Sequence, residues 1–156
     1  MGHVRSWDTE TPVGHTKREF EELIRRYGAT GFTVSEDYAS RTVVVAFSVK
    51  LSDGEMADVR LPLAYDTVKR NLFKCAPFAT RVRSKGEEWA DAQSARVAWR
   101  HLLLWAEASL AAVDAGLYSL QEAFFAHTMI ATPNGGLIPA IDAVNAMKQI
   151  TARSSQ

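Results

Sequence analysis

The chain has 156 residues, of which 47% are hydrophobic, so a single domain with a substantial core is expected. Its eighteen basic and eighteen acidic side chains cancel, which excludes a strong overall field toward nucleic acid or membrane. The sole cysteine, Cys75, excludes an internal disulfide framework, and every apolar run is much shorter than a membrane span.

Residues 1–15 show little apolar periodicity and are predicted to form a flexible arm. The first helix is predicted to begin at Thr16, because Thr16 and Glu19 have the spacing of a capping box. Gly28 is expected to end this helix in a left-handed conformation. An apolar stripe with helical spacing lies between these signals and consists of Phe20, Leu23, Ile24 and Tyr27.

Three strands are predicted next, over residues 32–36, 42–51 and 57–62. The segment 52–54, Ser-Asp-Gly, reads as a tight turn between the second and the third strand. Alternation with tight turns predicts an antiparallel meander that has one face covered by helices. The apolar face of the second strand consists of Val43, Val45, Phe47, Val49 and Leu51.

Residues 64–86 differ in composition from the rest of the chain. A short helix is predicted over 65–73, started by Asp66, and a long loop broken by Pro77 over 75–86. Asp66 is the only acid in this basic segment. Its cations are Lys69, Arg70, Lys74, Arg81, Arg83 and Lys85.

A long alanine-rich helix is predicted over 87–115, closed by Gly116. Ser119 and Glu122 form a second capping box, which opens a helix running to 127 or 129. A turn is expected at 133–136, followed by a terminal helix with Pro139 in its first turn and Met147 near its end.

Residues 16–150 are thus assigned to one domain, and 151–156 to a disordered tail. Strands segregated from helices predict an α+β fold: a three-stranded antiparallel meander packed against a long helix, with several shorter helices.

Over residues 16–138 the sequence resembles a family of small uncharacterised proteins encoded by tailed bacteriophages and prophages. The resemblance implies a phage product in the cytoplasm of a bacterial host, often encoded near replication and recombination functions. It implies no particular activity. The residues that carry it are Arg26 to Ala29, Phe47, Leu61 to Leu63, Trp99, Arg100, Leu102 to Leu104, Ala111, Val113, Gly116, Glu122, Phe124, Ala126, His127, Asn134 and Gly135.

The basic segment is the main functional lead. Lysine and arginine side chains neutralise phosphates and release counterions, and an aromatic ring such as Phe78 stacks on a base. The sequence therefore predicts a nucleic-acid contact through Phe78 and the six cations of this segment. The alternative is a solvated loop that Phe78 anchors to the core.

Three tryptophans of the long helix, Trp89, Trp99 and Trp105, are candidates for an interface or for the core. Trp99 and Trp105 lie about 240° apart around a helix, so one is expected on the sheet and the other against a neighbouring helix or a partner subunit. Arg96 and Arg100, four residues apart, are candidates for holding an anion; the alternative is ion pairing, of Arg96 with Asp91 or Glu88.

No residue pattern here points to catalysis. His101 and His127 lack partners at metal-ligand spacing, Cys75 is a lone thiol, and no phosphate loop or serine elbow is present, so no metal or cofactor is expected. The predicted function is a non-enzymatic phage accessory protein that binds DNA or a replication or recombination complex. The alternatives are an interaction module that docks on a host protein, with a homodimer as one form, and a counter-defence protein that sequesters a small ligand or nucleotide. An enzymatic role is disfavoured but stays open.

Overall fold

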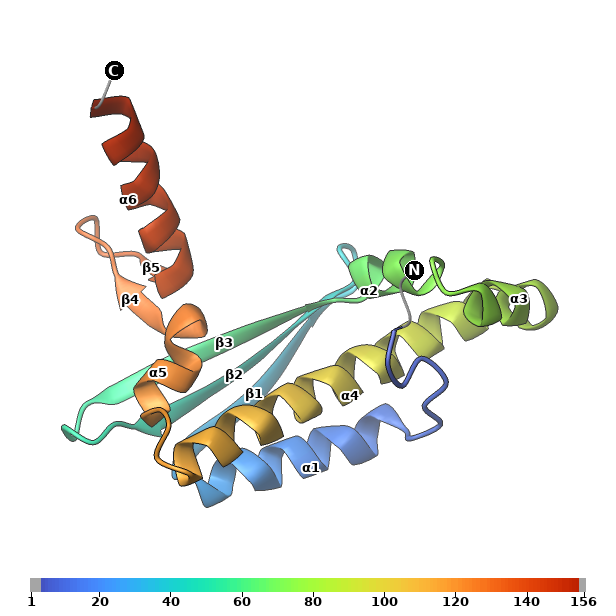
Figure 1. Cartoon of the computed structure of the whole chain (residues 1–156), viewed down its shortest axis with the longest axis horizontal. Coiled ribbons are helices and arrows are strands. Elements are labelled where there is room, and N and C mark those ends of the chain that lie inside the picture. Colours follow the sequence, from blue (N-terminus) through green and yellow to red (C-terminus); the bar gives the residue numbers. More distant parts are fainter. Residues whose placement is uncertain (1–3, 155–156) are drawn as a thin grey trace.

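The computed structural model describes residues 4–154, with side chains from 4 to 150. It confirms the predicted α+β fold, with a three-stranded antiparallel sheet in the order β1-β2-β3 and one long helix, α4 (Figure 1). In chain order the elements are α1 (Val13–Arg26), β1 (Ala29–Asp37), β2 (Thr42–Lys50), β3 (Met56–Ala64), α2 (Tyr65–Leu72), α3 (Ala76–Lys85), α4 (Glu87–Asp114), α5 (Leu120–Phe124), the 3-10 turn η1 (Phe125–His127), β4 (Met129–Ala131), β5 (Leu137–Pro139) and α6 (Ala140–Ser154).

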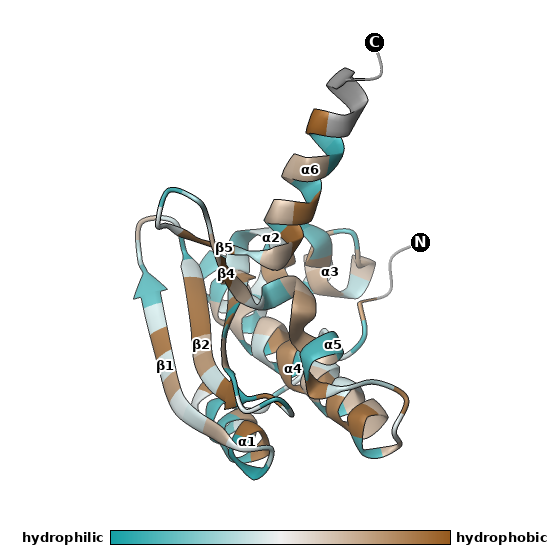
Figure 2. Ribbon diagram, turned by 90° about the vertical axis from the view of Figure 1, so that its left-hand side faces the viewer, coloured by the Kyte–Doolittle hydropathy of each residue, from teal (hydrophilic) through white to brown (hydrophobic). Residues whose placement is uncertain are grey.

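The main core lies between the sheet and two helices, α1 and α4 (Figure 1). Alternation along β2 buries Val43, Val45, Phe47 and Val49, as predicted, whereas the residues between them are only half-buried. Figure 2 shows the helices gathered on one side of β1 and β2. Aromatic rings close the core, since Phe47 packs edge-on against Phe20 at 6.0 Å and against Phe124 at 5.4 Å.

The first helix begins earlier than predicted. Pro12 is extended and precedes Val13, which opens α1, while Thr16 lies buried within the helix and caps no amide with its side chain. The predicted start at Thr16 is therefore wrong, because the helix begins one turn earlier, directly after Pro12. Within the predicted arm, the backbone carbonyls of Trp7 and Thr9 accept hydrogen bonds from Gln93 of α4, at 2.8 and 3.0 Å. Residues 1–3 lie outside the described part of the chain.

Residues 76–85 form a helix, α3, rather than the predicted loop. Pro77 sits in its first turn, where a proline loses no helical hydrogen bond. Phe78 and Val82, four residues apart, are buried in a second apolar cluster against α4, together with Leu72, Cys75, Ala90 and Val97. Gly86 then adopts φ +85°, a conformation that favours glycine, and lets α4 start directly after α3.

The C-terminal part of the chain departs from the body. The predicted capping box is confirmed, since the Ser119 hydroxyl accepts from the Glu122 amide at 3.2 Å and the Glu122 carboxylate accepts from the Ser119 amide at 2.7 Å. The helix it opens is short and passes into η1, and the turn at 133–136 joins two short strands that the sequence does not predict. Pro139 ends β5 instead of entering the helix. Helix α6 runs beyond Met147 to Ser154, so residues 151–154 of the predicted disordered tail are helical, and 155–156 lie outside the described residues.

Among residues 4–154, no helix combines the length and the hydropathy that crossing a bilayer requires.

Candidate interaction groove

One face of α4 carries an apolar stripe that is buried at Ala98 and Leu102 and only half-buried further along the helix. Its residues recur at alternating spacings of four and three, which keeps them on one side of a helix. The main core takes up five side chains of α4, and Leu102 is one that also belongs to the stripe: Trp99, Leu102, Leu103, Ala106 and Leu110. The stripe consists of Ala98, Leu102, Trp105, Ser109 and Ala112.

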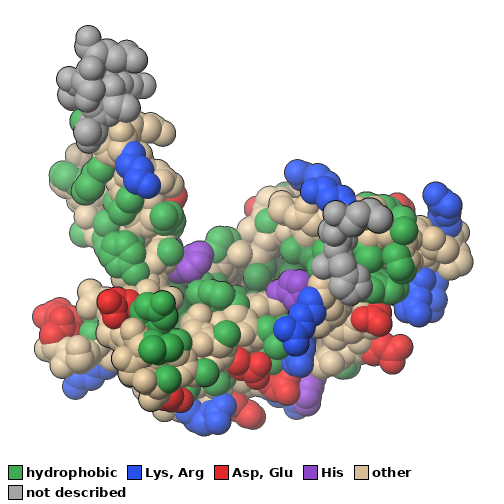
Figure 3. All heavy atoms as spheres, in the orientation of Figure 1, with side chains coloured by type: hydrophobic (Ala, Val, Ile, Leu, Met, Phe, Trp, Pro, Cys, Tyr) green, Lys and Arg blue, Asp and Glu red, His purple; other side chains and the backbone are tan. Residues whose placement is uncertain are grey.

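Two hollows follow this stripe, and Trp105 lines both of them. The first has a volume of about 450 Å³ and lies between α4, α2 and the end of β3, with Pro62, Val68 and His127 in its wall. The second has a volume of about 390 Å³ and lies between α4 and α5, with Tyr118 and Glu122 in its wall. We call the two hollows together the α4 groove. Figure 3 shows hydrophobic and histidine side chains in the recess between α6 and α2.

The floor of the α4 groove is uncharged. The ring of His127 stands edge-on to Trp105 at 5.7 Å between centroids, and burial lowers the pKa of His127, which favours the neutral ring. His101 lies 2.6 Å through Nε2 from the backbone carbonyl of Arg5, so Nε2 donates to that oxygen and ties the N-terminal segment to α4. Among the described residues, no group of three or more His, Cys, Asp or Glu side chains could hold a metal.

The predicted nucleic-acid residues do not form one surface. Phe78 is fully buried and packs edge-on against Phe73 at 5.3 Å, so the prediction that it stacks on a base is wrong. It belongs to the second apolar cluster because α3 is a helix that turns this side chain toward α4. Figure 3 shows lysine and arginine side chains at separate places over α2 and α3.

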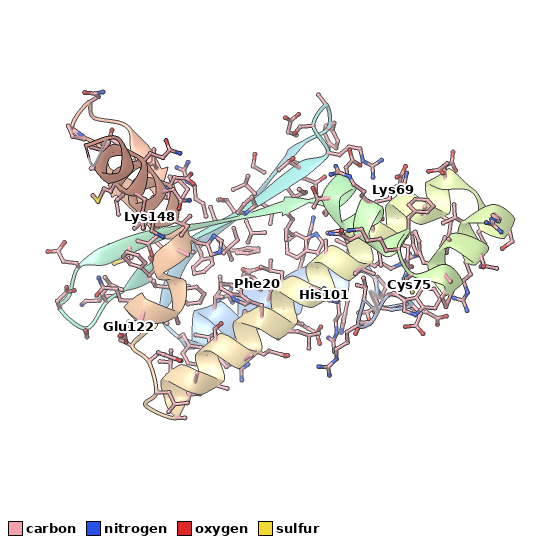
Figure 4. All side chains as sticks on the ribbon, turned by 45° about the horizontal axis from the view of Figure 1, so that its top comes forward. Phe20, Lys69, Cys75, His101, Glu122 and Lys148 are labelled. Atoms are coloured by element: carbon pink, nitrogen blue, oxygen red, sulfur yellow. The ribbon has the colours of Figure 1, made fainter. Side chains whose placement is uncertain are left out.

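Lys69 is committed to ion pairs rather than to solvent. Its Nζ lies 2.6 Å from Glu87 and 2.8 Å from Asp91 of α4, and Arg41 binds the other oxygen of Asp91 at 2.9 Å (Figure 4). Hydrogen bonds that Lys69 donates to Asp91 and Glu87 raise the pKa of Lys69, so the side chain keeps its charge. The other predicted cations are exposed: Arg70, Lys74, Arg81, Arg83 and Lys85. Of these, Lys74 donates to Asn71 at 2.9 Å and Arg81 lies over the Trp7 ring at 5.3 Å.

Of the three tryptophans predicted at an interface, Trp105 lines the α4 groove. Trp99 is fully buried in the main core, so its assignment to an interface is wrong. Trp89 packs on Phe78 at 5.5 Å in the second cluster. The structure therefore places Trp99 and Trp105 on different faces of α4, as their spacing predicts.

Arg96 and Arg100 stand on nearly the opposite side of α4 from the groove, by the rotation of the helix. The Nε of Arg96 donates to Gln93 at 2.9 Å, and Asp91, one of its predicted partners, is bound by Lys69 and Arg41 instead. The groove itself was missed by sequence reasoning, although its signal is the alternating spacing of the stripe. No family model, curated protein or solved structure matches the chain.

Proposed function

We propose that this chain is a protein-interaction module that takes up an amphipathic helix of a protein partner in the α4 groove. The observation that carries the proposal is the uncharged, heptad-spaced stripe on α4, whose residues line two open hollows while Leu102 also packs in the main core. Grooves of this kind bind the apolar face of a helix through anchors spaced by three and four residues.

The length of the groove favours a helix over a small molecule. From Ala98 to Ala112 the stripe rises by about 21 Å, at 1.5 Å per residue. The two open hollows, of about 450 and 390 Å³, continue along it without a charged side chain on the floor. A small ligand fills one enclosed pocket, whereas a helix fills a long open groove.

The setting that we propose follows from the resemblance to phage-encoded proteins. In that setting the chain acts in the cytoplasm of a bacterial host, and its partner is a protein of the phage or of the host. An interaction module needs no catalytic group, and the described residues offer neither a metal site nor a buried acid and base pair in the groove.

The test places a photo-crosslinking amino acid at Ala112, which lines the groove, and at Ala111, an exposed neighbour turned about 100° around the helix. Cells that express each variant are irradiated, and the adducts are identified by mass spectrometry. We expect a defined polypeptide adduct from position 112 and none from position 111. Equal adducts at both positions, or none at 112, would contradict the proposal.

Nucleic-acid binding is the second candidate function, and one observation favours it. Among residues 4–154, no ion pair involves the five exposed cations that remain in the basic segment: Arg70, Lys74, Arg81, Arg83 and Lys85. Exposed cations without an acidic partner bind phosphates without sequence preference, which fits DNA or a replication or recombination complex.

Fluorescence anisotropy with single-stranded and duplex DNA, at low and at physiological salt, tests this second candidate. We expect the wild type to bind DNA more weakly as the salt concentration rises, and the double variant Arg83→Glu, Lys85→Glu to lose this binding. The matched control reverses two exposed charges on α1, Arg18→Glu with Arg26→Glu, and keeps the same net charge. Equal loss in both variants would show a nonspecific charge effect and contradict this site.

A further inference from the structure

Helix α6 projects from the body and carries an apolar stripe of its own (Figure 1, Figure 2). The stripe is buried at its first residue and becomes exposed along the helix: Ala140 is 1% exposed, whereas Met147 and Ile150 are 65% and 66% exposed. Its members share one side of the helix at spacings of three and four residues. They are Ala140, Ala143, Val144, Met147 and Ile150.

This stripe does not meet the α4 groove of its own chain. The Ala140 amide donates to the Thr128 carbonyl at 2.9 Å, and the paired strands β4 and β5 hold the segment that leads into α6. Both ribbon views show α6 directed away from α4 (Figure 1, Figure 2). The fold therefore holds the helix and the groove apart within one copy.

The two surfaces are complementary in shape. The α4 stripe rises by about 21 Å and the α6 stripe, from Ala140 to Ile150, by about 15 Å, so the α6 stripe is short enough to lie within the groove. Small residues at Ala98, Ser109 and Ala112 leave hollows on either side of Trp105. The larger side chains of α6, Val144 and Met147 among them, fit such hollows as knobs fit holes between packed helices.

The charges beside the two stripes are complementary. Glu122 is the acidic residue in the wall of the groove, and Lys148 is exposed next to the α6 stripe (Figure 4). A helix laid along the groove would bring a cation toward that carboxylate. An ion pair at the rim of a contact adds orientation more than affinity.

We propose that the α4 groove of one copy binds α6 of a second copy, so that the chain forms a homodimer by reciprocal exchange of its C-terminal helices. A two-fold axis makes the two contacts identical, so each copy donates one helix and accepts one. This inference rests on the proposed function and names the partner of the same groove.

Sedimentation equilibrium of the full chain tests it, with an expected mass twice the 17.2 kDa of one chain. The groove variant Ala112→Glu and the helix variant Met147→Glu are each expected to weaken dimerisation at least about tenfold, because each puts a charge into an apolar contact. Ala111→Glu and Asn145→Glu are the matched controls, since both lie outside the stripes and are exposed. They are expected to leave the dimer unchanged.

A mixture of the two weakened variants distinguishes a dimer formed by helix exchange from dimers formed in other ways. A mixed pair keeps one intact contact, between the α6 of the Ala112→Glu copy and the groove of the Met147→Glu copy. Where one charge already abolishes the contact that it enters, the second charge in the other contact adds no cost, and the mixture is expected to dimerise more tightly than either variant by itself. A monomeric wild type, a dimer that both variants leave intact, or a mixture no tighter than its parts would overturn the inference.

The crosslinking experiment keeps the two proposals distinguishable. An adduct from position 112 to a different polypeptide would sustain the interaction module and overturn the self-association. An adduct to α6 of the same sequence would support both.

Discussion

The indole Nε1 of Trp99 donates a hydrogen bond of 2.8 Å to the phenolic oxygen of Tyr65. Trp99 comes from the middle of α4 and is fully buried, while Tyr65 opens α2 directly after β3. The bond therefore links the residue that follows β3 to α4, and it gives the buried indole N–H an acceptor. Burial raises the pKa of Tyr65, and the hydrogen bond from Trp99 opposes that rise.

Replacing the acceptor is expected to destabilise the fold. In Tyr65→Phe the ring stays but the indole N–H is left unpaired, which costs about 1–3 kcal/mol of the free energy of unfolding. Urea denaturation followed by far-UV circular dichroism measures the change. Tyr38→Phe is the control, because Tyr38 is 85% exposed, and no change is expected there. Equal stability of Tyr65→Phe and the wild type would contradict the role of this bond.

A second prediction concerns Asp91, which joins Lys69 and Arg41. Burial pushes the pKa of Asp91 upward, but hydrogen bonds from Lys69 and Arg41 outweigh it and hold the pKa below the ordinary 3.8. A carboxyl group with a lowered pKa stabilises the fold above its unfolded pKa, and this contribution is lost as the pH falls through the folded value. Stability of the wild type should therefore fall as the pH drops below about 4.

Asp91→Asn is expected to cost about 1 kcal/mol at neutral pH, since the side chain is a third exposed and solvent screens the pairs. The variant should also lose less stability than the wild type on acidification. Thermal unfolding at several pH values measures both effects, with Asp8→Asn, an exposed carboxylate, as the control. A parallel decline in wild type and Asp91→Asn would contradict the assignment.

The strands and the second capping box could be predicted because their signals are local. Alternation from Val43 to Val49 puts one set of side chains on one face, and Ser119 with Glu122 satisfies backbone amides within a single turn. The two strands around the turn at 133–136 have three residues each, too few to show alternation.

Helix α3 and the groove depend on contacts from far along the chain. Pro77 and the basic residues read as a loop, and the helical signal reduces to Phe78 and Val82, whose burial requires α4. The alanine-rich sequence of α4 predicts a helix without showing which faces the sheet and α2 take. The spacing of Trp99 and Trp105 predicts different faces of α4 but does not show which of the two enters the core; the fold buries Trp99 and leaves Trp105 in the groove.

The burial of Phe78 leads to a third prediction. Phe78→Ala is expected to cost about 3–5 kcal/mol, because it removes a fully buried ring from the second apolar cluster and leaves a cavity. Urea denaturation measures the loss, and Arg83→Ala on the exposed side of the same helix is the control. If Phe78→Ala kept the stability of the wild type, the side chain would not be part of a core.

The last prediction follows from the ring of His127 in the groove. Burial lowers its pKa from the ordinary 6.5, so the unfolded chain binds a proton at a pH where the folded chain does not. Stability is therefore full above about pH 6.5 and falls as the solution is acidified toward the folded pKa. His127→Gln cannot take up this proton, and its stability should change less between about pH 7.5 and about pH 5.5.

Urea unfolding at the two pH values measures the difference in stability. The experiment uses the Ala112→Glu background, so that no occupant of the groove contributes. His15→Gln is the control, because that side chain is 52% exposed on α1. An equal loss of stability in His127→Gln and its parent would place the titrating group elsewhere. A smaller loss would show that acid opposes the packing of His127 against Trp105, the contact at the centre of the groove.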